Sequence, residues 1–483
     1  MGEGAEAGAT AQVQPGAAGA RALAAVLAAV AAAHASGLGG AFQFDDFRVI
    51  VGDPRVRSLG AWWRAMPGIR PLLKLSFALD HQLGLGLVGF HAQSLAIHLA
   101  ATALAFLLLA RMGRQLALPA AAAPLGAALF ALHPAQTEAV TYLSGRSAAL
   151  GGALALASVL AFVAGRDRDR PRPLLVHGLS PLLMVLALCA RESAVAIPAA
   201  LLLAEALDPA PFRWRRALAA TAVHWVVLGA AAAGFLASPT YRGMVEQSLT
   251  LRPPLENALT HARALLWLAG QVLRPDLLSV DPGLAPVASA GAGAVLSGLV
   301  VLGAAAGGVL LLRGWPVAGF AVCWFLLWAA PQGVWLPRAE PASDRQLYVA
   351  LLGPAWLAAV WLARLRSPPR RALAASVLLV GLGAGTALRN RVYRDEVTFW
   401  SDVVEKAPGH ARGHANLGYA LALACRPEEA DRALTRAMAL DPDDPTPAWN
   451  RRFLRAGTLL GPDERARCGT APGRLREGEA TSR

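Results

Sequence analysis

Residues 20–38 read ARALAAVLAAVAAAHASGL, and a short loop then leads to the acidic pair Asp45 and Asp46. The apolar run is long enough to cross a bilayer, because about 20 helical residues span the hydrocarbon core. The preceding Met-Gly-Glu-Gly-Ala-Glu lacks the basic region of a signal peptide. We therefore expect a first membrane helix that is retained and not cleaved.

The acidic pair follows this helix directly, so the sequence places it at a membrane boundary. Two neighbouring carboxylates are costly to hold ionised near hydrocarbon. One reason to keep them is catalysis, because a carboxylate at the membrane surface can take a proton from an acceptor hydroxyl. The alternative is a solvated loop that ends the helix and caps the next element.

The composition of the whole chain is that of a polytopic membrane protein. Its 483 residues are 55% hydrophobic and only 16% charged, with a mean hydropathy of +0.43. Soluble domains average roughly 25% charged residues. The formal charge of +13 does not indicate nucleic-acid binding, because the basic residues gather in short clusters between apolar segments, as in positive-inside membrane proteins.

Apolar runs recur along the chain and predict an all-α transmembrane bundle of about eleven spans. We place them at 20–38, 88–110, 115–133, 147–164, 174–190, 192–207, 217–237, 290–312, 316–330, 346–363 and 371–388. A further apolar stretch, 257–274, is shorter and carries His261, Arg263 and Gln271. We interpret it as an interfacial or re-entrant helix that does not cross.

Arginine clusters set the expected orientation of the spans. They lie at Arg111/Arg114, 166–172, 213–216 and 364–371, and all should be cytoplasmic. Residues 1–20 then form a cytoplasmic tail and 39–87 the first extracytoplasmic loop of the membrane domain, 21–388. The C-terminus then lies outside the cytoplasm, and we expect the protein to lie in a bacterial cytoplasmic membrane.

Residues 389–454 form a charged unit with a tetratricopeptide pattern. With Ala411 as position one, the positions that define the 34-residue repeat are filled by Leu417, Gly418, Ala430, Leu434, Ala437 and Pro442. Because about three repeats are usually needed for stability, we expect contacts with the membrane domain to stabilise this unit, or a protein partner to continue it. We expect the tail, 455–483, to be disordered.

The four cysteines show no pattern that indicates a metal site or a disulfide framework. Cys189 and Cys323 fall in apolar segments, and neither they nor Cys425 and Cys468 form a CxxC pair.

Four polar sets lie at the predicted outer face. They are Asp45/Asp46, the segment His133–Arg146 with Glu138, the pair Arg191-Glu192, and Asp344-Arg345 followed by Tyr348. Each also has a structural interpretation: Glu138 could pair with Arg146, Arg191 with Glu192, and Arg345 could snorkel. Together the sets offer carboxylates for a base and guanidinium groups for a phosphate.

The chain resembles the GT-C membrane glycosyltransferases with tetratricopeptide tails, the protein O-mannosyltransferase family, as a bacterial-type homologue. The matching stretches keep the family's order from residue 44 to 396: Phe44-Asp45-Asp46, Arg70-Pro71-Leu72, Phe90-His91-Ala92-Gln93 with His98, Phe130-Ala131-Leu132-His133-Pro134, Thr137-Glu138-Ala139-Val140, Gly145-Arg146, Arg191-Glu192, Asp344-Arg345-Gln346-Leu347-Tyr348, Asn390-Arg391 and Arg394-Asp395-Glu396. The chain departs from the family in showing one clear repeat and in having Arg191 where a lysine is common.

The resemblance implies transfer of a sugar, such as mannose, from a polyprenyl-phosphate carrier to a protein Ser/Thr hydroxyl, with inversion. Asp45 or Asp46 matches the family's catalytic acid of the first loop. The remaining site residues divide into acceptor-side support, His133, Glu138 and Glu192, and donor-phosphate binding, Arg146, Arg191, Arg345 and Tyr348. No sequence feature requires a metal or another cofactor.

Two other functions fit the same composition. A transporter of lipid-linked glycans would show repeated halves and polar groups near the midplane. A membrane scaffold would use its outer repeat to recruit partners. The polar sets at one face favour the transferase over both.

Overall fold

The computed structural model describes residues 16–66, 68–208, 212–333, 337–338, 340–459, 461 and 468. Every regular element in these residues is a helix, which confirms the predicted all-α membrane bundle. Most of the predicted N-terminal tail, and the predicted disordered tail apart from 455–459, 461 and 468, fall outside the described residues.

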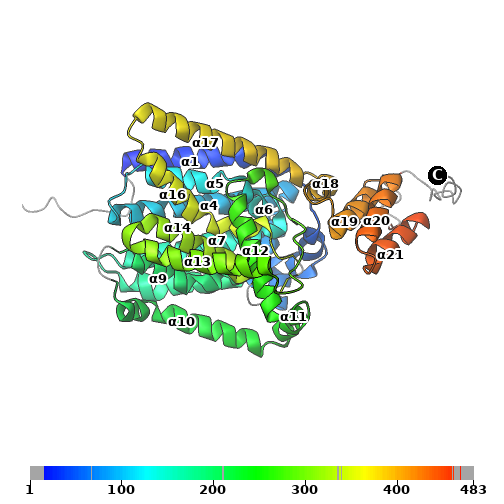
Figure 1. Cartoon of the computed structure of the whole chain (residues 1–483), viewed down its shortest axis with the longest axis horizontal. Helices are drawn as coiled ribbons and strands as arrows, with labels where there is room; N and C mark the ends of the chain where they lie inside the picture. Colours follow the sequence, from blue (N-terminus) through cyan, green and yellow to red (C-terminus); the bar gives the residue numbers. More distant parts are fainter. Residues whose placement is uncertain are drawn as a thin grey trace, which may run out of the picture.

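Within the described residues, six helices are long and apolar enough to cross a membrane (Figure 1), so the chain is a multi-pass integral membrane protein. They are α1 (Ala17–His34, prolonged by a 3-10 turn to Gly39), α4 (Gly86–Gln115), α7 (Arg146–Gly165, preceded by a 3-10 turn from Leu143), α10 (Trp214–Ala237), α13 (Ala292–Gly314) and α17 (Pro368–Arg389, followed by a 3-10 turn to Tyr393). A bent pair of helices gives a seventh span if it crosses as one broken helix. It consists of α15 (Leu347–Ala350, with its preceding turn) and α16 (Leu352–Ala363), which meet at 54°.

Each of the remaining predicted spans contains a shorter helix. These are α5 (Ala122–Ala131), α8 (Ser180–Ala190), α9 (Ile197–Ala206) and α14 (Pro316–Ala329). A helix of 14 residues is only ~21 Å long, against ~30 Å of hydrocarbon. The expected 257–274 helix, α12 (Pro254–Gln271), is not among the helices that are both long and apolar enough to cross.

Small residues let the central helices pack closely, as is usual in membrane bundles. A Cβ added at Gly152 of α7 would lie 2.8 Å from the ring of Tyr348, and one at Gly353 of α16 would lie 2.9 Å from the backbone of Ala321. Trp324 and Trp356 are fully buried beside these contacts. The apolar core therefore depends on glycine where helices cross.

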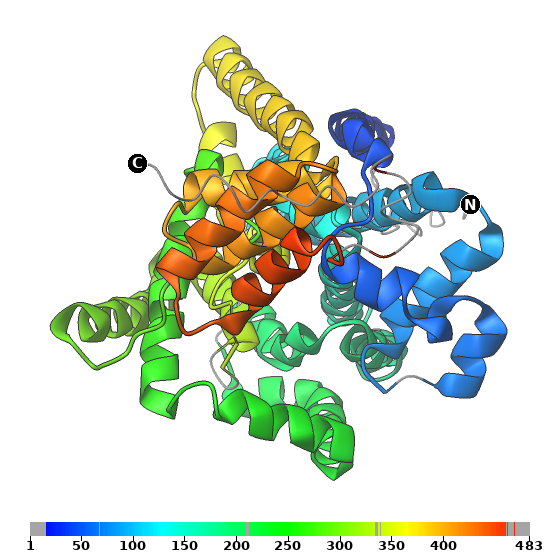
Figure 2. The same cartoon turned by 90° about the vertical axis from the view of Figure 1, so that its right-hand side faces the viewer.

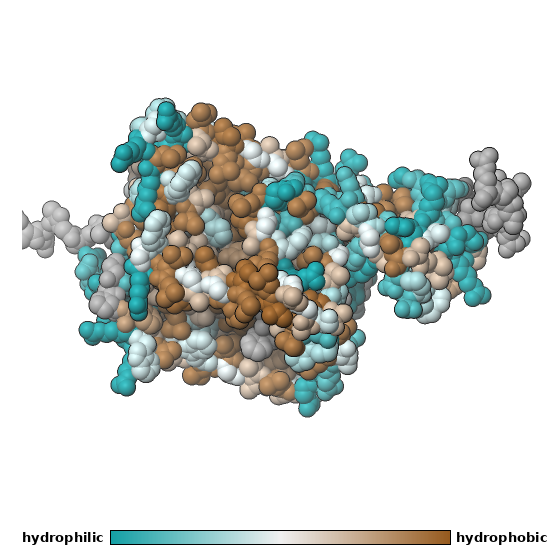
Figure 3. All heavy atoms as spheres, in the orientation of Figure 1, coloured by the Kyte–Doolittle hydropathy of each residue, from teal (hydrophilic) through white to brown (hydrophobic). Residues whose placement is uncertain are grey.

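The bundle has two polar ends separated by an apolar band (Figure 3). At one end Arg111 pairs with Asp167 and Arg166 with Glu205. The four polar sets predicted for the outer face lie at the other end. α4 runs from one end to the other: His91 lies near its start and Arg111 near its end, some 30 Å apart at 1.5 Å per residue. The predicted cytoplasmic clusters and the candidate site are thus at opposite ends.

The C-terminal unit comprises α18 (Glu396–Lys406), α19 (Ala411–Leu423), α20 (Pro427–Leu440) and α21 (Pro445–Arg455), in orange and red in Figure 2. The repeat positions pack as the spacing predicts. A Cβ at Gly418 would lie 2.7 Å from Leu434, and Ala430 and Ala437 are buried. Shorter helices lie outside this unit: α2 (Leu59–Ala65), α3 (Pro71–Leu83) and α11 (Pro239–Leu249) belong to the loops of the membrane domain, and α6 (Thr137–Val140) belongs to the candidate site.

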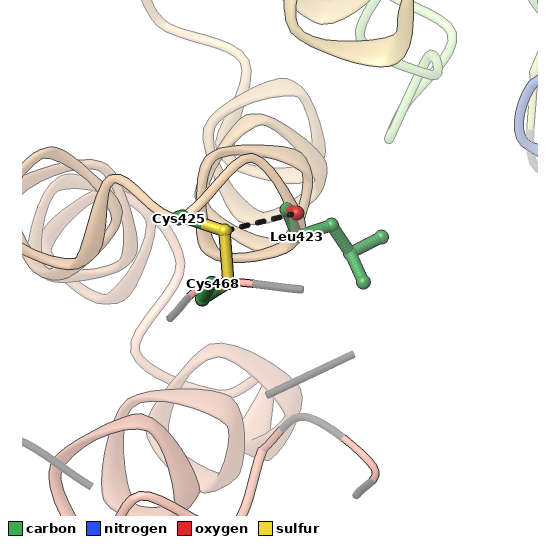
Figure 4. The surroundings of a disulfide bond; sticks show 3 residues. All are labelled: Leu423, Cys425 and Cys468. Atoms are coloured by element: carbon green, nitrogen blue, oxygen red, sulfur yellow. Dashed lines mark hydrogen bonds between the residues drawn. A yellow bond between two sulfur atoms is a disulfide. The ribbon is translucent and has the colours of Figure 1, made fainter. Parts of the chain in front are cut away.

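A disulfide joins Cys425 to Cys468, with 5.4 Å between their Cα atoms (Figure 4). The expectation that no disulfide is indicated was therefore wrong. The two cysteines are 43 positions apart, and no local spacing marks them as partners. The bond joins Cys468 to Cys425 in the turn between α19 and α20. Cys189 and Cys323 are free, as expected for thiols in apolar helices.

Candidate active site at the outer face

Asp46 is fully buried and held by hydrogen bonds. Its Oδ1 accepts from the backbone N–H and the hydroxyl of Ser144, at 2.7 and 2.5 Å, and its Oδ2 accepts from the N–H of Gln43 at 3.1 Å. Burial raises the pKa of Asp46 to about 7, and these hydrogen bonds offset part of the rise. The carboxyl group ties the first outer loop to the segment before α7 and is not accessible to an acceptor.

Asp45 points the other way and remains accessible. Its side chain is 35% exposed, with Arg48 3.9 Å away, and its backbone N–H donates to the Tyr142 hydroxyl at 3.2 Å. It lines a small pocket that Asp46 does not reach. Of the two carboxylates that the sequence left equivalent, Asp45 has the position of a catalytic group.

Glu138 and Arg345 form the second part of this pocket. Glu138 is 1% exposed; its Oε2 accepts from the backbone N–H of Arg345 at 2.8 Å, and its Oε1 accepts from Ser343 at 3.2 Å and lies 3.6 Å from the Arg345 guanidinium. Burial raises the pKa of Glu138, and Arg345 opposes that rise. Glu138 therefore pairs with Arg345, not with Arg146.

Arg146 does not reach the site. It is fully buried, and its N–H groups donate to the side chains of Asp80, Gln93, Ser94 and Ser76 and to the carbonyl of Phe90. A guanidinium has five N–H donors, and five acceptors surround this one. Arg146 forms a buried ion pair between α3 and α7 and does not line the pocket, and its phosphate-binding role remains a prediction.

His133 and Tyr348 also serve the packing of the bundle. His133 accepts at Nδ1 from the N–H of Ala135 (3.1 Å), and its Nε2 lies 3.2 Å from the carbonyl of Val272. The Tyr348 hydroxyl lies 2.8 Å from Nδ1 of His98, inside the bundle. The polar atoms of both side chains contact protein groups, and their roles in acceptor support and phosphate binding remain predictions.

A cluster of four arginines lies beside the pocket: Arg70, Arg191, Arg338 and Arg345. Arg70 holds Glu192 in a two-pronged ion pair with N–O distances of 2.8–3.1 Å, and Arg191 donates to Ser147 at 2.9 Å. Burial lowers the pKa of Arg191, and the nearby positive charges of Arg70, Arg345 and Arg338 lower it further. Glu192, Glu138 and Glu340 neutralise part of this positive charge, and the charge that remains suits a phosphate.

The pocket is closed by the C-terminal unit. Besides Asp45, Glu138 and Arg345, its walls include Phe399 and Trp400 of α18 and Arg412 of α19. Its volume of about 20 Å³ holds a single water, well below the ~300–1,000 Å³ of ligand pockets.

Arg412 ties α19 to the outer face. It contacts Glu340 and lies 2.7 Å from Asp281, which also pairs with His410 at 2.7 Å. These ion pairs hold α19 against the loops of the membrane domain. Ion pairs and aromatic packing together therefore keep the C-terminal unit in place beside the pocket.

Several of these residues carry no signal in the sequence. Arg70 lies in one of the family-like motifs, so its role could have been found there. Arg338, Glu340 and Arg412 lie in loops or on a helix surface, where charged residues are expected anyway. Only the fold brings them to Asp45. In the described part of the chain, no three His, Cys, Asp or Glu side chains are placed to hold a metal ion.

Comparisons with known proteins give one match. An alignment of 178 residues, 33% of this chain, is 32% identical to Protein O-mannosyl-transferase Tmtc2 of Drosophila melanogaster and covers 19% of that protein. The chain therefore spans only about a fifth of the length of this relative. No family model and no solved structure matches the chain. Its sequence is thus similar, over a third of its length, to part of a protein O-mannosyl-transferase.

Proposed function

We propose that this protein is a membrane glycosyltransferase that moves a hexose, such as mannose, from a polyprenyl-phosphate carrier to a protein Ser/Thr hydroxyl on the extracytoplasmic face. One observation carries the proposal: an accessible carboxylate, Asp45, lies at the membrane surface beside arginines that gather around Arg191. The similarity to Tmtc2 supports the transferase class. The donor, the acceptor and the compartment are part of the proposal.

The proposed step is a single displacement. Asp45 takes the proton of the acceptor hydroxyl as its oxygen attacks the anomeric carbon. The bond from that carbon to the phosphate oxygen breaks, and the phosphate leaves with the electron pair. Attack from the face opposite the leaving group inverts the anomeric centre.

The arginines stabilise the departing charge. Arg191, Arg70 and Arg345 would face the phosphate, where fixed positive charge is worth more than in water. Glu192 orients Arg70, and Glu138 orients Arg345, so each carboxylate acts as a positioning group. Because the pocket beside Asp45 is small, we expect its walls to separate when a sugar and a peptide bind.

The catalytic assignment is tested with Asp45→Asn. Loss of a general base costs ~10²–10⁴-fold in rate, and we expect a fall of this size in hexose transfer from polyprenyl phosphate to a Ser/Thr peptide, with unchanged protein abundance. Ser58→Ala removes a helix cap in the same loop and serves as the control for a general disturbance of that loop. Transfer at the wild-type rate in Asp45→Asn would remove Asp45 from the mechanism.

The donor assignment is tested by titrating the polyprenyl-phosphate sugar in detergent. Arg191→Ala and Arg70→Ala should weaken donor affinity more than acceptor affinity. Arg191→Lys should rescue only part, because lysine lacks the planar fork that fits a phosphate. Arg213→Ala, at the opposite end of the bundle, is the control. Unchanged donor affinity in both alanine variants would show that the cluster does not bind the phosphate.

A further inference from the structure

Two arginines approach one carboxylate in the wall of the pocket beside Asp45. Oε1 of Glu340 contacts the guanidinium of Arg412, and Oε2 of Glu340 lies 3.5 Å from the guanidinium of Arg345. All three side chains line the pocket. Arg345 belongs to the membrane domain, whereas Arg412 belongs to α19 of the C-terminal unit (Figure 1). Glu340 therefore lies where the two parts of the chain meet.

The two contacts of Glu340 differ in kind. Arg412 donates a hydrogen bond to Glu340, whereas Arg345 approaches it only as an ion pair. Glu138, the other carboxylate beside Arg345, lies 3.6 Å from the guanidinium and accepts a hydrogen bond only from the backbone N–H of Arg345. In the described part of the chain, the guanidinium of Arg345 thus makes no hydrogen bond. Its N–H donors remain available to a ligand oxygen.

Arg412 is also held by a second carboxylate, Asp281. The Nε of Arg412 donates to Asp281 at 3.0 Å, and its Nη2 lies 2.7 Å from the same carboxyl group. Asp281 is buried, so it fixes the guanidinium of Arg412 at the surface of the membrane domain. Arg412 is therefore already paired with two carboxylates, and it reaches Arg345 only through Glu340.

Without Arg412, the nearby guanidinium of Arg345 would attract Glu340. The Glu340 side chain is 21% exposed, and the residue lies in a loop outside the helices. Hydrogen bonds between a guanidinium and a carboxylate are shorter than the present separation by less than ~1 Å. A small shift of Glu340 would therefore form such a bond and occupy N–H donors of Arg345.

We propose that Arg412 is a positioning residue of the donor site. It keeps Glu340 hydrogen-bonded to the C-terminal unit, so that the guanidinium of Arg345 stays open to the phosphate of the polyprenyl-phosphate sugar. The C-terminal unit then contributes to donor binding as well as to the wall of the pocket. This inference rests on the proposed function, because the ligand of Arg345 is the donor phosphate.

The test measures binding of polyprenyl phosphate to the full-length protein in detergent, by calorimetric titration without an acceptor. Arg412→Gln should weaken binding about 5-fold, the scale of a partly exposed ion pair. Glu340→Gln should bind at least as tightly as wild type, because the competing carboxylate is gone. The double variant Arg412→Gln/Glu340→Gln should regain wild-type affinity. Arg412→Lys, which keeps a positive charge beside Glu340, should retain most of it.

The rescue by Glu340→Gln separates positioning from folding. If Arg412 only held the C-terminal unit in place, removing a second charge from the junction would not restore donor affinity. Arg451→Gln is the matched control, because Arg451 forms an ion pair with Asp431 at 2.8 Å within the same unit. It should bind polyprenyl phosphate as wild type does. In transfer assays, Arg412→Gln should raise the donor KM and leave the acceptor KM unchanged.

A second measurement does not need the donor. Phenylglyoxal modifies accessible arginines, and mass spectrometry locates the modified residues. Labelling of Arg345 should fall in Arg412→Gln and return in the double variant. If wild-type protein binds no polyprenyl phosphate, the donor assignment of the proposed function fails, and the labelling decides whether Arg412 controls Arg345. A double variant that behaves like Arg412→Gln, or an Arg412→Gln variant that behaves like wild type, would overturn the proposal.

Discussion

At the scale of single residues, Asp45 and Asp46 are neighbours with opposite environments. Phe44, the residue before them, has φ = 42°, a left-handed conformation that is strained for a side chain of this size. Its N–H donates to Glu396 of α18 at 2.9 Å. At this strained turn the carboxylate of Asp46 points into the protein, and that of Asp45 lines the pocket.

The burial of Asp46 makes stability depend on pH. Its pKa of about 7 in the folded protein exceeds the ordinary value of 3.8. Between these values the unfolded state binds fewer protons, so the stability contributed by Asp46 falls as pH rises from about 4 to about 7, by ~4 kcal/mol at most. Asparagine does not titrate. The Tm of Asp46→Asn relative to wild type should therefore increase between pH 4 and pH 8.

Thermal unfolding in detergent at a series of pH values measures this difference. A relative Tm that stays constant or declines with pH would contradict a raised pKa for Asp46. Asp45→Asn, at the accessible neighbour, is the control and should show no comparable trend.

At the scale of elements, the turn between α6 and α7 depends on Gly145. An added Cβ would lie 1.8 Å from the carbonyl oxygen of Glu138, which no real contact allows. Gly145→Ala must displace the backbone of Glu138, and we expect a destabilisation above ~3 kcal/mol together with loss of transfer. Gly178→Ala is the control, because its Cβ would meet nothing within 4 Å. Equal thermal stability of the two variants would show that the turn is not constrained in this way.

The disulfide between Cys425 and Cys468 closes a covalent loop of the chain that contains the helices α20 and α21. Closing a loop of this length contributes ~2–4 kcal/mol in the chain-entropy account. We expect Cys425→Ser to increase proteolysis of the C-terminal unit while the membrane domain stays intact. Wild-type protein, alkylated directly in cells before any reductant, should retain two unmodified cysteines at positions 425 and 468. Alkylation of both would show that the bond does not form.

At the scale of the whole molecule, the two ends of the bundle predict its orientation. Arginine clusters fill one end, and the candidate site, the C-terminal unit and the disulfide lie at the other. Structural disulfides persist in oxidising compartments, and arginine-rich loops stay in the cytoplasm. A reporter that works only in the cytoplasm should therefore be inactive when fused after residue 450 and active when fused after residue 168. Activity at position 450 would reverse the topology.

The sequence by itself determined the class of fold and indicated the end of the bundle at which the candidate site lies. Hydropathy alone identifies membrane helices, because a spanning segment must satisfy its backbone internally and cover itself with apolar side chains. The sequence also pointed to Asp45, Glu138, Arg191 and Arg345, because each lies in a stretch that matches the motifs of the family that the chain resembles.

Only the tertiary structure decided which of those residues share a pocket. Arg146 and Arg345 are equally plausible phosphate ligands in the sequence, yet the first is enclosed by Asp80 and its neighbours and the second faces Asp45. The disulfide and the wall supplied by Arg412 likewise depend on packing. Contacts between residues far apart in the chain depend on how helices meet, and no local pattern of spacing records that geometry.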